Sequence, residues 1–245
     1  MTHRALLHWV LLLCTPTVWS TQETATQKVS ALGGRLFHKK GEVVEVVLNG
    51  ATFKSGGLNF LSDFPQLTDL SLEKTSASDK DMLVVAKLPR LEWLNLYRTQ
   101  VGDEGARHLS RSKSLKLLPA GGTKITDGGI AQLANAAQLT YLGLRANRIT
   151  DKSAPHLAKL LKLEGLYLGE TQVTDETVRT LAKLPKLEKL WLHDLPITDA
   201  SVEFLSKIKT LRELHIYATK ISSEGARRLQ SALPRCRVIH EAIVK

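Results

Sequence analysis

Trp191, His193 and Asp194 are the side chains of this sequence that could most readily do chemistry, because an imidazole beside a carboxylate can activate a nucleophile or ligate a metal. His215 would add a second imidazole. The spacing supports neither chemistry, since the sequence has no His-x-His, HExxH or G-x-S-x-G pattern. We therefore predict no catalytic residue, no metal ligand and no cofactor, and interpret these side chains as a polar rim of a binding surface.

A repeat of 24 residues positions these side chains. Each unit follows L-x-x-L-x-L-x-x-T-x-[IV]-T-D and continues with apolar residues three apart. The first half alternates as a strand with one buried face does, and the second half has helical spacing. Such units bury their apolar faces only by stacking, so we expect one solenoid. The eight units begin at Val43, Leu67, Leu91, Leu115, Leu139, Leu163, Leu187 and Leu211.

The thirteenth position of the unit is Asp or Ser in every repeat. Both residues are favourable N-caps, whose side-chain oxygen accepts free N–H groups of the first helical turn. We therefore predict that this residue caps the helix of its own repeat. A ladder of carboxylates could instead bind cations, but the Ser residues favour capping. The residues are Ser55, Asp79, Asp103, Asp127, Asp151, Asp175, Asp199 and Ser223.

The repeat resembles the leucine-rich-repeat family, most closely its exported bacterial members with 24-residue units, and its spacing is similar to that of F-box ubiquitin-ligase receptors. The resemblance covers Val43 to about Leu233. It implies an α/β solenoid with a curved parallel sheet on the concave side and short helices on the convex side. The ninth position, often Asn in the family, is mostly Thr here. Asn occurs only at Asn147, and Ala51 and Leu195 interrupt the row.

The segments outside the repeats divide the chain further. We predict a signal peptide at 1–20, an N-terminal cap at 21–42, the solenoid at 43–234 and a C-terminal cap at 235–245. In the first cap we expect a helix near 27–32, a stop at Gly33-Gly34 and a strand at 35–38. In the second, Cys236, Val238 and Ile243 suggest a closing strand, with Cys236 a buried thiol.

The first twenty residues have the composition of a secretory signal. Arg4 precedes an apolar run from Ala5 to Leu13, and small residues surround Ser20, after which we expect cleavage. Lipidation of Cys14 is the alternative, but the residue before a lipidated cysteine is usually small, and Leu13 is not. No segment has the roughly 20 apolar residues of a membrane helix. We expect an exported protein, either secreted, periplasmic or at the cell surface.

Strand geometry directs positions three, five and seven of each repeat onto the concave face. Every Trp and Tyr after residue 20 falls on one of these positions, whereas no Phe does. Exposed aromatic side chains with a polar edge are frequent binding anchors, although they also protect a sheet face by packing on each other. The six are Trp93, Tyr97, Tyr141, Tyr167, Trp191 and Tyr217.

We predict a shallow aromatic groove over repeats five to eight, with Gly143 and Gly165 leaving low ground beside it. A smaller patch lies on repeat three. Between them, Pro119 removes a strand N–H group, so we expect a bend or interruption there. The predicted ligand-binding residues are Trp93, Asn95, Tyr97, Tyr141, Arg145, Tyr167, Trp191, His193, His215 and Tyr217.

The formal charge of +10 does not indicate specific nucleic-acid binding, because the excess of basic residues lies on helices and loops. On the outward strand positions only Arg145 and Lys189 are basic.

We predict a non-enzymatic module that binds another protein or peptide through its concave face. Glycan or cell-envelope binding by the same aromatic row, a substrate-binding role like that of ubiquitin-ligase receptors but without an F-box, and a purely structural scaffold are the alternatives.

Overall fold

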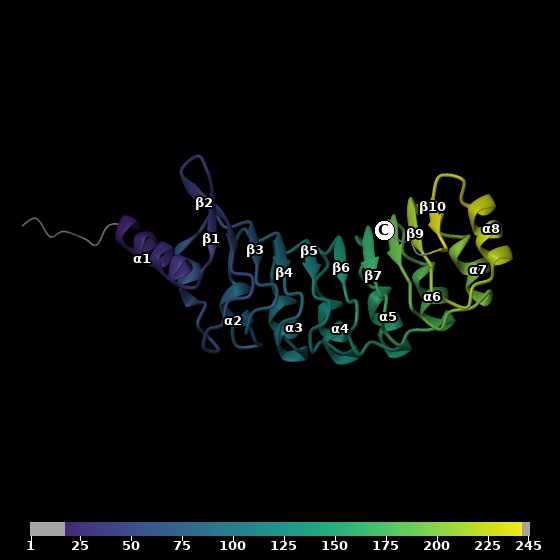
Figure 1. Cartoon of the computed structure of the whole chain (residues 1–245), viewed down its shortest axis with the longest axis horizontal. Coiled ribbons are helices and arrows are strands. Elements are labelled where there is room, and N and C mark those ends of the chain that lie inside the picture. Colours follow the sequence, from purple (N-terminus) through teal and green to yellow (C-terminus); the bar gives the residue numbers. More distant parts are fainter. Residues whose placement is uncertain (1–17, 242–245) are drawn as a thin grey trace, which may run out of the picture.

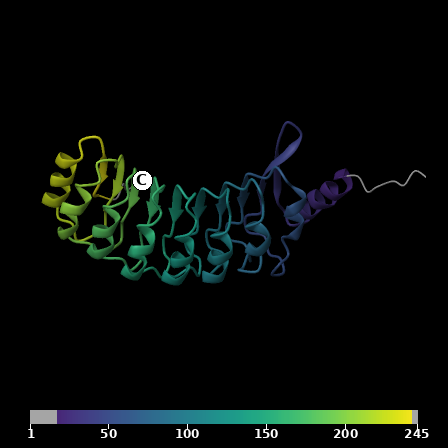
Figure 2. The ribbon, with the colours of Figure 1, turned by 180° about the vertical axis from the view of Figure 1, so that it is seen from behind.

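The computed structural model describes residues 18–241, and side chains from residue 23 onward. It is a curved solenoid with strands along one side and helices along the other (Figure 1). Figure 2 shows the same two layers from behind. The predicted α/β leucine-rich-repeat solenoid is confirmed. Most of the predicted signal segment, Cys14 and Ile243 lie outside the described residues.

Ten strands form a single sheet in chain order. The first two are antiparallel, and every later neighbour pair is parallel. Each repeat contributes only a short strand because its next residues must turn toward the helical side. The strands are β1 (Arg35–Lys39), β2 (Glu42–Val47), β3 (Asp69–Ser71), β4 (Trp93–Asn95), β5 (Leu117–Pro119), β6 (Tyr141–Gly143), β7 (Gly165–Tyr167), β8 (Lys189–Trp191), β9 (Glu213–His215) and β10 (Arg237–Ile239).

The helices cover the opposite side of the core. They are short because one repeat leaves room for only one or two helical turns between strands. They are α1 (Val18–Ala31), α2 (Met82–Val85), α3 (Asp103–Leu109), α4 (Asp127–Leu133), α5 (Ala154–Leu157), α6 (Asp175–Leu181), α7 (Ala200–Leu205) and α8 (Ser223–Ala232), with 3-10 helices η1 (Asn59–Asp63) and η2 (Asp151–Ser153).

The core is a continuous stack of equivalent side chains. Leu70 pairs in register with Leu94, and Leu166 with Leu190, so each leucine lies directly beside its counterpart in the next repeat. These side chains have no exposed surface. Burying an apolar side chain of this size contributes roughly 1.5–3 kcal/mol, which is why the leucine spacing determines the fold.

Both ends of the stack are covered. Helix α1 begins well before the predicted Gln27 and ends before Gly33, which has a φ of +70°. The strand expected at 35–38 is β1, which forms a hairpin with β2. At the other end β10 closes the sheet, and Cys236 is buried beside it as expected. Burial raises the pKa of the Cys236 thiol to about 11. No helix within residues 18–241 has the length and apolar character needed to cross a bilayer.

The recurrent Asp does not cap its own helix, so that prediction is wrong. The caps are the preceding residues, such as Thr126, Thr150 and Thr174, whose hydroxyls accept a backbone N–H at 3.2–3.3 Å. Helix α7, which begins immediately after Asp199, receives no side-chain cap from this residue. The Thr has the extended backbone that a cap requires, whereas the Asp that follows it already belongs to the helix.

Each Asp instead binds the next repeat. In five of the six, one carboxylate oxygen accepts a backbone N–H at 2.7–2.9 Å and the other accepts the hydroxyl of the same residue at 2.6–2.8 Å, whereas Asp79 accepts only the N–H of Gly102 at 2.6 Å. This Asp ladder joins adjacent repeats along the edge where strands lead into helices. Its pairs are Asp103 with Thr126, Asp127 with Thr150, Asp151 with Thr174, Asp175 with Thr198 and Asp199 with Ser222.

The ninth position stabilises the turn that follows each strand. The hydroxyls of Thr75 and Thr171 donate to the carbonyl three residues earlier at 2.7 Å. Asn147 spans two repeats, because its amide donates to the carbonyl of Ala120 and its oxygen accepts the N–H of Thr123. At the ninth position Thr therefore bonds within its own repeat, whereas Asn147 joins two repeats.

The sheet is not interrupted at Pro119. The carbonyl of Pro119 accepts the N–H of Leu96 at 2.8 Å, and the carbonyl of Gly121 accepts the N–H of Arg98 at 2.9 Å. The proline lacks only its own donor, so the neighbouring bonds maintain the ladder. The expected interruption is therefore wrong: β4, β5 and β6 are successive neighbours in one sheet.

Candidate functional site

The concave face of repeats five to eight carries a cluster of six aromatic rings. Tyr167 and Trp191 have ring centroids 5.5 Å apart, and Trp191 lies 5.7 Å from His215. Tyr141 meets Trp191 edge-on at 6.3 Å. We call Tyr141, Tyr167, Trp191, His193, His215 and Tyr217 the aromatic cluster, because each ring contacts at least one other.

His193 supports the cluster from within. Its ring is stacked on Tyr217 at 4.6 Å with an interplanar angle of 4°, and only 1% of the residue is exposed. Nε2 lies 2.7 Å from the Tyr167 hydroxyl, and Nδ1 lies 2.8 Å from the Asp194 carboxylate. The ring has space because Gly169 has no side chain: a Cβ there would lie 2.6 Å from the imidazole. His193 therefore orients its neighbours and offers little surface to a ligand.

Gly165 does not form low ground beside the row, contrary to prediction, whereas Gly143 does line a hollow of the concave face. The Tyr141 ring lies over Gly165, where a Cβ would be 2.7 Å from Cδ2 of that ring. The same ring approaches a Cβ position on Gly143 at 3.3 Å. Aromatic side chains thus occupy the space beside Gly165. Part of the predicted groove is nevertheless present, because Tyr141, Gly143, Arg145 and Tyr167 of repeats five and six line a hollow of the concave face.

The hollow of the concave face lies nearer the N-terminus, over repeats two to six. It has a volume of about 240 Å³. Pro119, Gly121 and Gly143 line it with small or rigid residues, while Tyr97 and Tyr167 come from repeats on either side. The irregular fourth repeat therefore creates the depression without breaking the sheet. The lining is Glu73, Asn95, Tyr97, Pro119, Gly121, Tyr141, Gly143, Arg145 and Tyr167.

The hollow links the two predicted patches. Asn95 and Tyr97 come from the smaller patch, and Tyr141 and Tyr167 belong to the aromatic cluster. Trp93 is the exception: it lies half-buried on β4 beside Asp69, and it neither lines the hollow nor joins the cluster. The sequence contained the signal for the hollow, because Pro119 and Gly121 are the small or rigid side chains at outward positions of the fourth repeat.

Charged pairs border the aromatic residues. Arg145 donates to the Glu170 carboxylate, with Nε 2.6 Å from Oε1, and this hydrogen bond raises the pKa of the guanidinium. His215 Nε2 lies 2.6 Å from Glu213. Burial raises the pKa of the Tyr141 and Tyr167 hydroxyls, so both remain neutral hydrogen-bonding groups at physiological pH.

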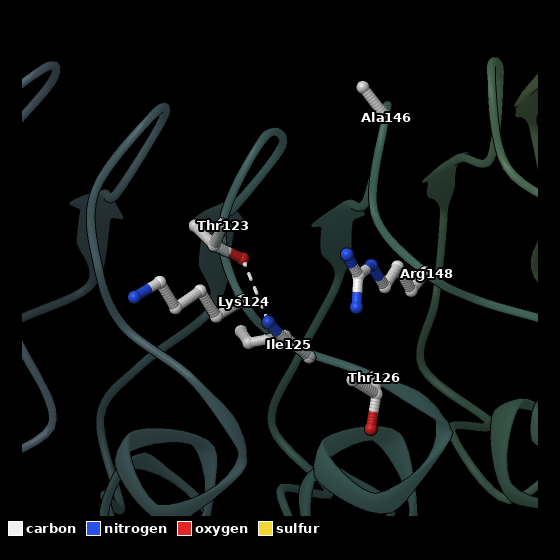
Figure 3. A pocket seen from close by; sticks show the side chains of 6 residues that line it. All are labelled: Thr123, Lys124, Ile125, Thr126, Ala146 and Arg148. Atoms are coloured by element: carbon white, nitrogen blue, oxygen red, sulfur yellow. Dashed lines mark hydrogen bonds between the residues drawn. The ribbon is translucent and has the colours of Figure 1, made fainter.

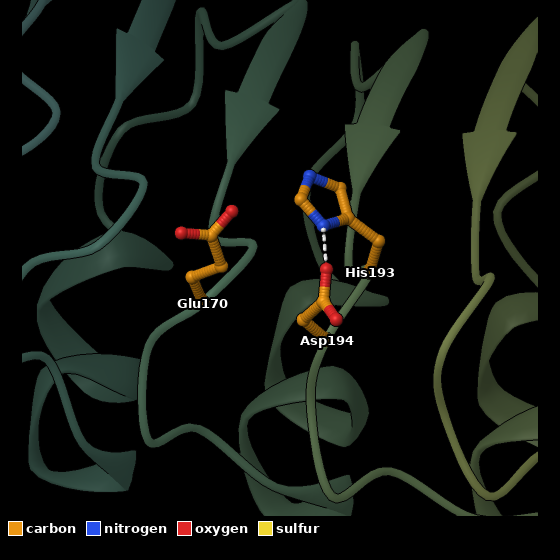
Figure 4. Close-up of side chains that lie close together, drawn as sticks. All are labelled: Glu170, His193 and Asp194. Atoms are coloured by element: carbon orange, nitrogen blue, oxygen red, sulfur yellow. Dashed lines mark hydrogen bonds and ion pairs between the residues drawn. The ribbon is translucent and has the colours of Figure 1, made fainter. Parts of the chain in front are cut away.

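Glu170, His193 and Asp194 bring two carboxylates and an imidazole together (Figure 4). One ligand atom from each lies within 4.8 Å of the others. Asp194 and Glu170 occupy the eighth position of adjacent repeats, where the backbone is left-handed with φ of 55° and 59°. Arg145 already neutralises Glu170, and Nδ1 of His193 is directed at Asp194. The geometry is that of an ion pair between Arg145 and Glu170 beside a chain of hydrogen bonds from Asp194 through His193 to Tyr167.

The left-handed turn is a feature that sequence reasoning missed. It recurs at the eighth position of every repeat with φ between 51° and 76°, although only two of these residues are glycine. The strain is offset by a bond between repeats: the N–H of Glu170 donates to the carbonyl of His193, and that of Asp194 to Tyr217. The residues are Gly50, Lys74, Arg98, Gly122, Ala146, Glu170, Asp194 and Ala218.

A second hollow of about 350 Å³ lies beside the turns that follow strands β5 and β6 (Figure 3). Thr123, Ile125 and Thr126 line it from one repeat, and Ala146 and Arg148 from the next. No aromatic side chain lines it, and sequence reasoning did not single out its residues. We therefore place the candidate binding site on the concave face.

Comparisons with known proteins agree with the solenoid. No protein-family model and no curated protein sequence matches the chain. Among solved structures, it is similar to internalin C2 from Listeria monocytogenes, with a TM-score of 0.63 and 24% identity over 87% of this chain and 91% of that one. An internalin (inlF) from the same organism gives 0.58 and 22%, covering 80% of this chain and 59% of that chain.

A plant protein shares the architecture more distantly. The leucine-rich-repeat ectodomain of the membrane receptor kinase GASSHO1/SCHENGEN3 from Arabidopsis thaliana, solved in complex with CASPARIAN STRIP INTEGRITY FACTOR 2, has a TM-score of 0.54 and 14% identity. The match covers 84% of this chain and 25% of that one. The repeats, the parallel sheet and these neighbours together show that the chain has the leucine-rich-repeat solenoid fold.

Proposed function

We propose that the concave face binds another protein or a peptide without catalysis. The observation that carries this proposal is the aromatic cluster, which gathers six rings on one face of a rigid sheet beside a hollow. Tyr and Trp side chains are enriched among binding anchors because they combine large apolar area with a polar edge. The plant receptor ectodomain was solved in complex with a factor, which is consistent with recognition by this architecture.

Tyr167 and Trp191 are the proposed anchors. Both are half-buried on adjacent strands and stack at 5.5 Å, so little conformational entropy is lost when a partner covers them. The hollow next to Tyr167 has room for one side chain of the partner. At its rim Arg145 would donate hydrogen bonds and Glu170 would accept them.

A pull-down with residues 21–245 as bait, followed by affinity measurement on the captured partner, tests this proposal. We expect Tyr167→Ala/Trp191→Ala to weaken binding by about 30-fold or more, corresponding to at least about 2 kcal/mol. Leu161→Ala is the control, because Leu161 is 57% exposed and lies outside the concave strands. Equal affinity of the double variant and the control would refute the proposal, and so would a loss of affinity that only follows a loss of thermal stability.

Glycan recognition by the same face is the second candidate. The supporting observation is that hydrogen-bonded polar pairs lie beside the two half-buried rings: His215 with Glu213 next to Trp191, and Arg145 with Glu170 next to Tyr167. A sugar ring could stack on the indole while its hydroxyls reach these groups. A glycan array separates the candidates, because a purely protein-binding face gives no sugar signal above that of the double Ala variant.

We also infer that the protein is exported. Arg4 and the apolar run from Ala5 to Leu13 support this inference. Expression with the native N-terminus, followed by mass spectrometry of the product, should yield a chain that starts at Thr21. A product that retains Met1 would contradict the inference, and a lipidated product starting at Cys14 would favour membrane anchoring.

A further inference from the structure

One edge of the solenoid carries a row of cations that the concave site does not use. It is the edge where each helix leads into the next strand, at positions 21 and 24 of the repeats. We call it the basic edge and define it by Lys87, Arg90, Lys159, Lys162, Lys183 and Lys186. All six are exposed.

Backbone hydrogen bonds hold these residues in a line. The N–H of Glu188 donates to the carbonyl of Glu164 at 2.8 Å, and the N–H of Glu164 donates to that of Thr140 at 2.8 Å. Glu164 and Glu188 come two residues after Lys162 and Lys186, which occupy position 24. The backbone at position 24 is therefore also aligned from repeat to repeat. Lys162 confirms the proximity: its Nζ lies 2.8 Å from Oε1 of Gln138, the residue at the same position of the preceding repeat.

The charge of the basic edge is not neutralised within the described chain. None of its six defining side chains forms an ion pair with a described residue. Three carboxylates follow these cations in the sequence: Glu92, Glu164 and Glu188. Glu92 is paired with Lys116, and neither Glu164 nor Glu188 forms an ion pair with a defining cation of the basic edge among the described residues. Like charges one strand spacing apart repel, so a bound polyanion would relieve an unfavourable arrangement.

Hollows extend the basic edge at both ends. At the N-terminal end, Lys39, Lys40 and Arg90 line one of about 370 Å³. At the C-terminal end, Lys209 and Arg235 line another of about 230 Å³. The cations therefore form two groups, one around repeat two and one over repeats five and six, separated by the uncharged Asn135 and Gln138 of repeat four.

We propose that the basic edge binds a linear acidic polysaccharide that carries sulfate or phosphate groups. The cations form a narrow file along the solenoid, which matches an extended polymer better than the broad plane of a membrane. No Trp, Tyr or Phe occurs at positions 20–24 of repeats two to eight, so the edge lacks the stacking platforms of single-stranded nucleic-acid sites. Lysine predominates, and its compact charge suits sulfate and phosphate without demanding a fixed geometry.

Heparin is the probe for the test, and its affinity is measured by calorimetry over a series of salt concentrations. The test variant combines Lys159→Gln, Lys162→Gln, Lys183→Gln and Lys186→Gln. We expect its affinity for heparin to be about 10-fold or more lower at moderate salt. The slope of log K against log salt should also be smaller in magnitude by about two to four, because fewer counterions are released on binding.

The control variant makes the same change in charge on the opposite edge, through Lys124→Gln, Arg148→Gln, Lys152→Gln and Lys220→Gln. It should stay within about threefold of the unmodified protein, since the polymer would contact one edge only. Equal losses in the two variants would overturn the proposal by showing a response to net charge alone. Tighter binding to anionic vesicles or to an oligo-dT of equal charge than to heparin would also overturn it.

The Trp191→Ala variant distinguishes this proposal from the concave-face function. Trp191 lies on a different surface from the basic edge, so heparin affinity should be unchanged in this variant even if partner binding is lost. Loss of heparin binding in Trp191→Ala would place the polyanion on the concave face and refute the edge site. Unchanged heparin binding by the four-lysine variant would refute it whatever the concave face binds.

Discussion

Removing Asp151 tests the Asp ladder most directly. Its carboxylate accepts the backbone N–H and hydroxyl of Thr174 at 2.8 and 2.6 Å, and the N–H and hydroxyl of Thr177 at 3.3 and 2.6 Å. Asp127, at the same position of the preceding repeat, accepts only the N–H and hydroxyl of Thr150. The two residues thus form a matched pair that differs in the number of donors.

We expect Asp151→Ala to lower the free energy of unfolding by about 3 kcal/mol and Asp127→Ala by about 1.5 kcal/mol. A hydrogen bond to a charged acceptor contributes about 1.5–3 kcal/mol, the bonds of one carboxylate are not additive, and Thr177 would keep a buried hydroxyl without its acceptor. For a domain of this size the corresponding decreases in Tm are about 6–12 °C and 3–6 °C.

Urea unfolding followed by circular dichroism measures the difference in free energy of unfolding between the two variants. Adding Thr177→Val to each background measures the coupling energy between Asp151 and Thr177. In the Asp151→Ala background Thr177→Val should cost less than in the unmodified protein, because its partner is already absent. Equal destabilisation by Asp151→Ala and Asp127→Ala, with no coupling to Thr177, would refute the contribution of the Thr177 bonds, and no loss of stability in either variant would refute the ladder.

Three further predictions follow from the structure. Gly169→Ala should destabilise the chain by about 1–3 kcal/mol through the clash with His193, and in a His193→Ala background most of that cost should vanish; an undiminished cost in thermal unfolding would contradict this. Burial opposes ionisation of Asp151, but the hydrogen bonds to its carboxylate outweigh burial and lower its pKa, and the backbone N–H of Ser222 lowers the pKa of Asp199. The stabilisation by both carboxylates is complete above pH 3.8 and is lost as the pH falls through the lowered pKa values. Asp151→Asn should therefore flatten the acid unfolding curve, and an unchanged curve would contradict this prediction. Native Cys236 should react with a thiol reagent at pH 8 far more slowly than in denaturant, and equal rates would show that the thiol is accessible.

The repeat spacing predicted most of the fold. Leucines at fixed positions have one way to be buried together, so register, strand direction and the position of the helices follow from the spacing. The same map placed Tyr141, Tyr167 and Trp191 on the concave face, where all three lie half-exposed. These predictions succeeded because strand alternation depends on neighbours along the chain.

The Asp ladder could not be inferred from one unit. An Asp after Thr satisfies the local pattern of a helix cap, and only the distance to the next repeat shows that Asp151 accepts from Thr174 and Thr177. The sequence also predicted capping by the wrong member of the Thr-Asp pair, because both residues are good N-caps and the backbone angles decide between them.

The sequence by itself determined which leucines form the core, since this depends on periodicity, but it did not show that His193, at an outward position, is only 1% exposed. Only the tertiary structure decided where the concave face is hollow. That outcome depends on ring positions: the Tyr141 ring lies 2.7 Å from a Cβ position on Gly165 and the His193 ring 2.6 Å from one on Gly169, whereas the Tyr97 ring stays 3.3 Å from one on Gly121. Side-chain packing between repeats therefore places the hollow over repeats two to six, where it overlaps the predicted groove only at repeats five and six.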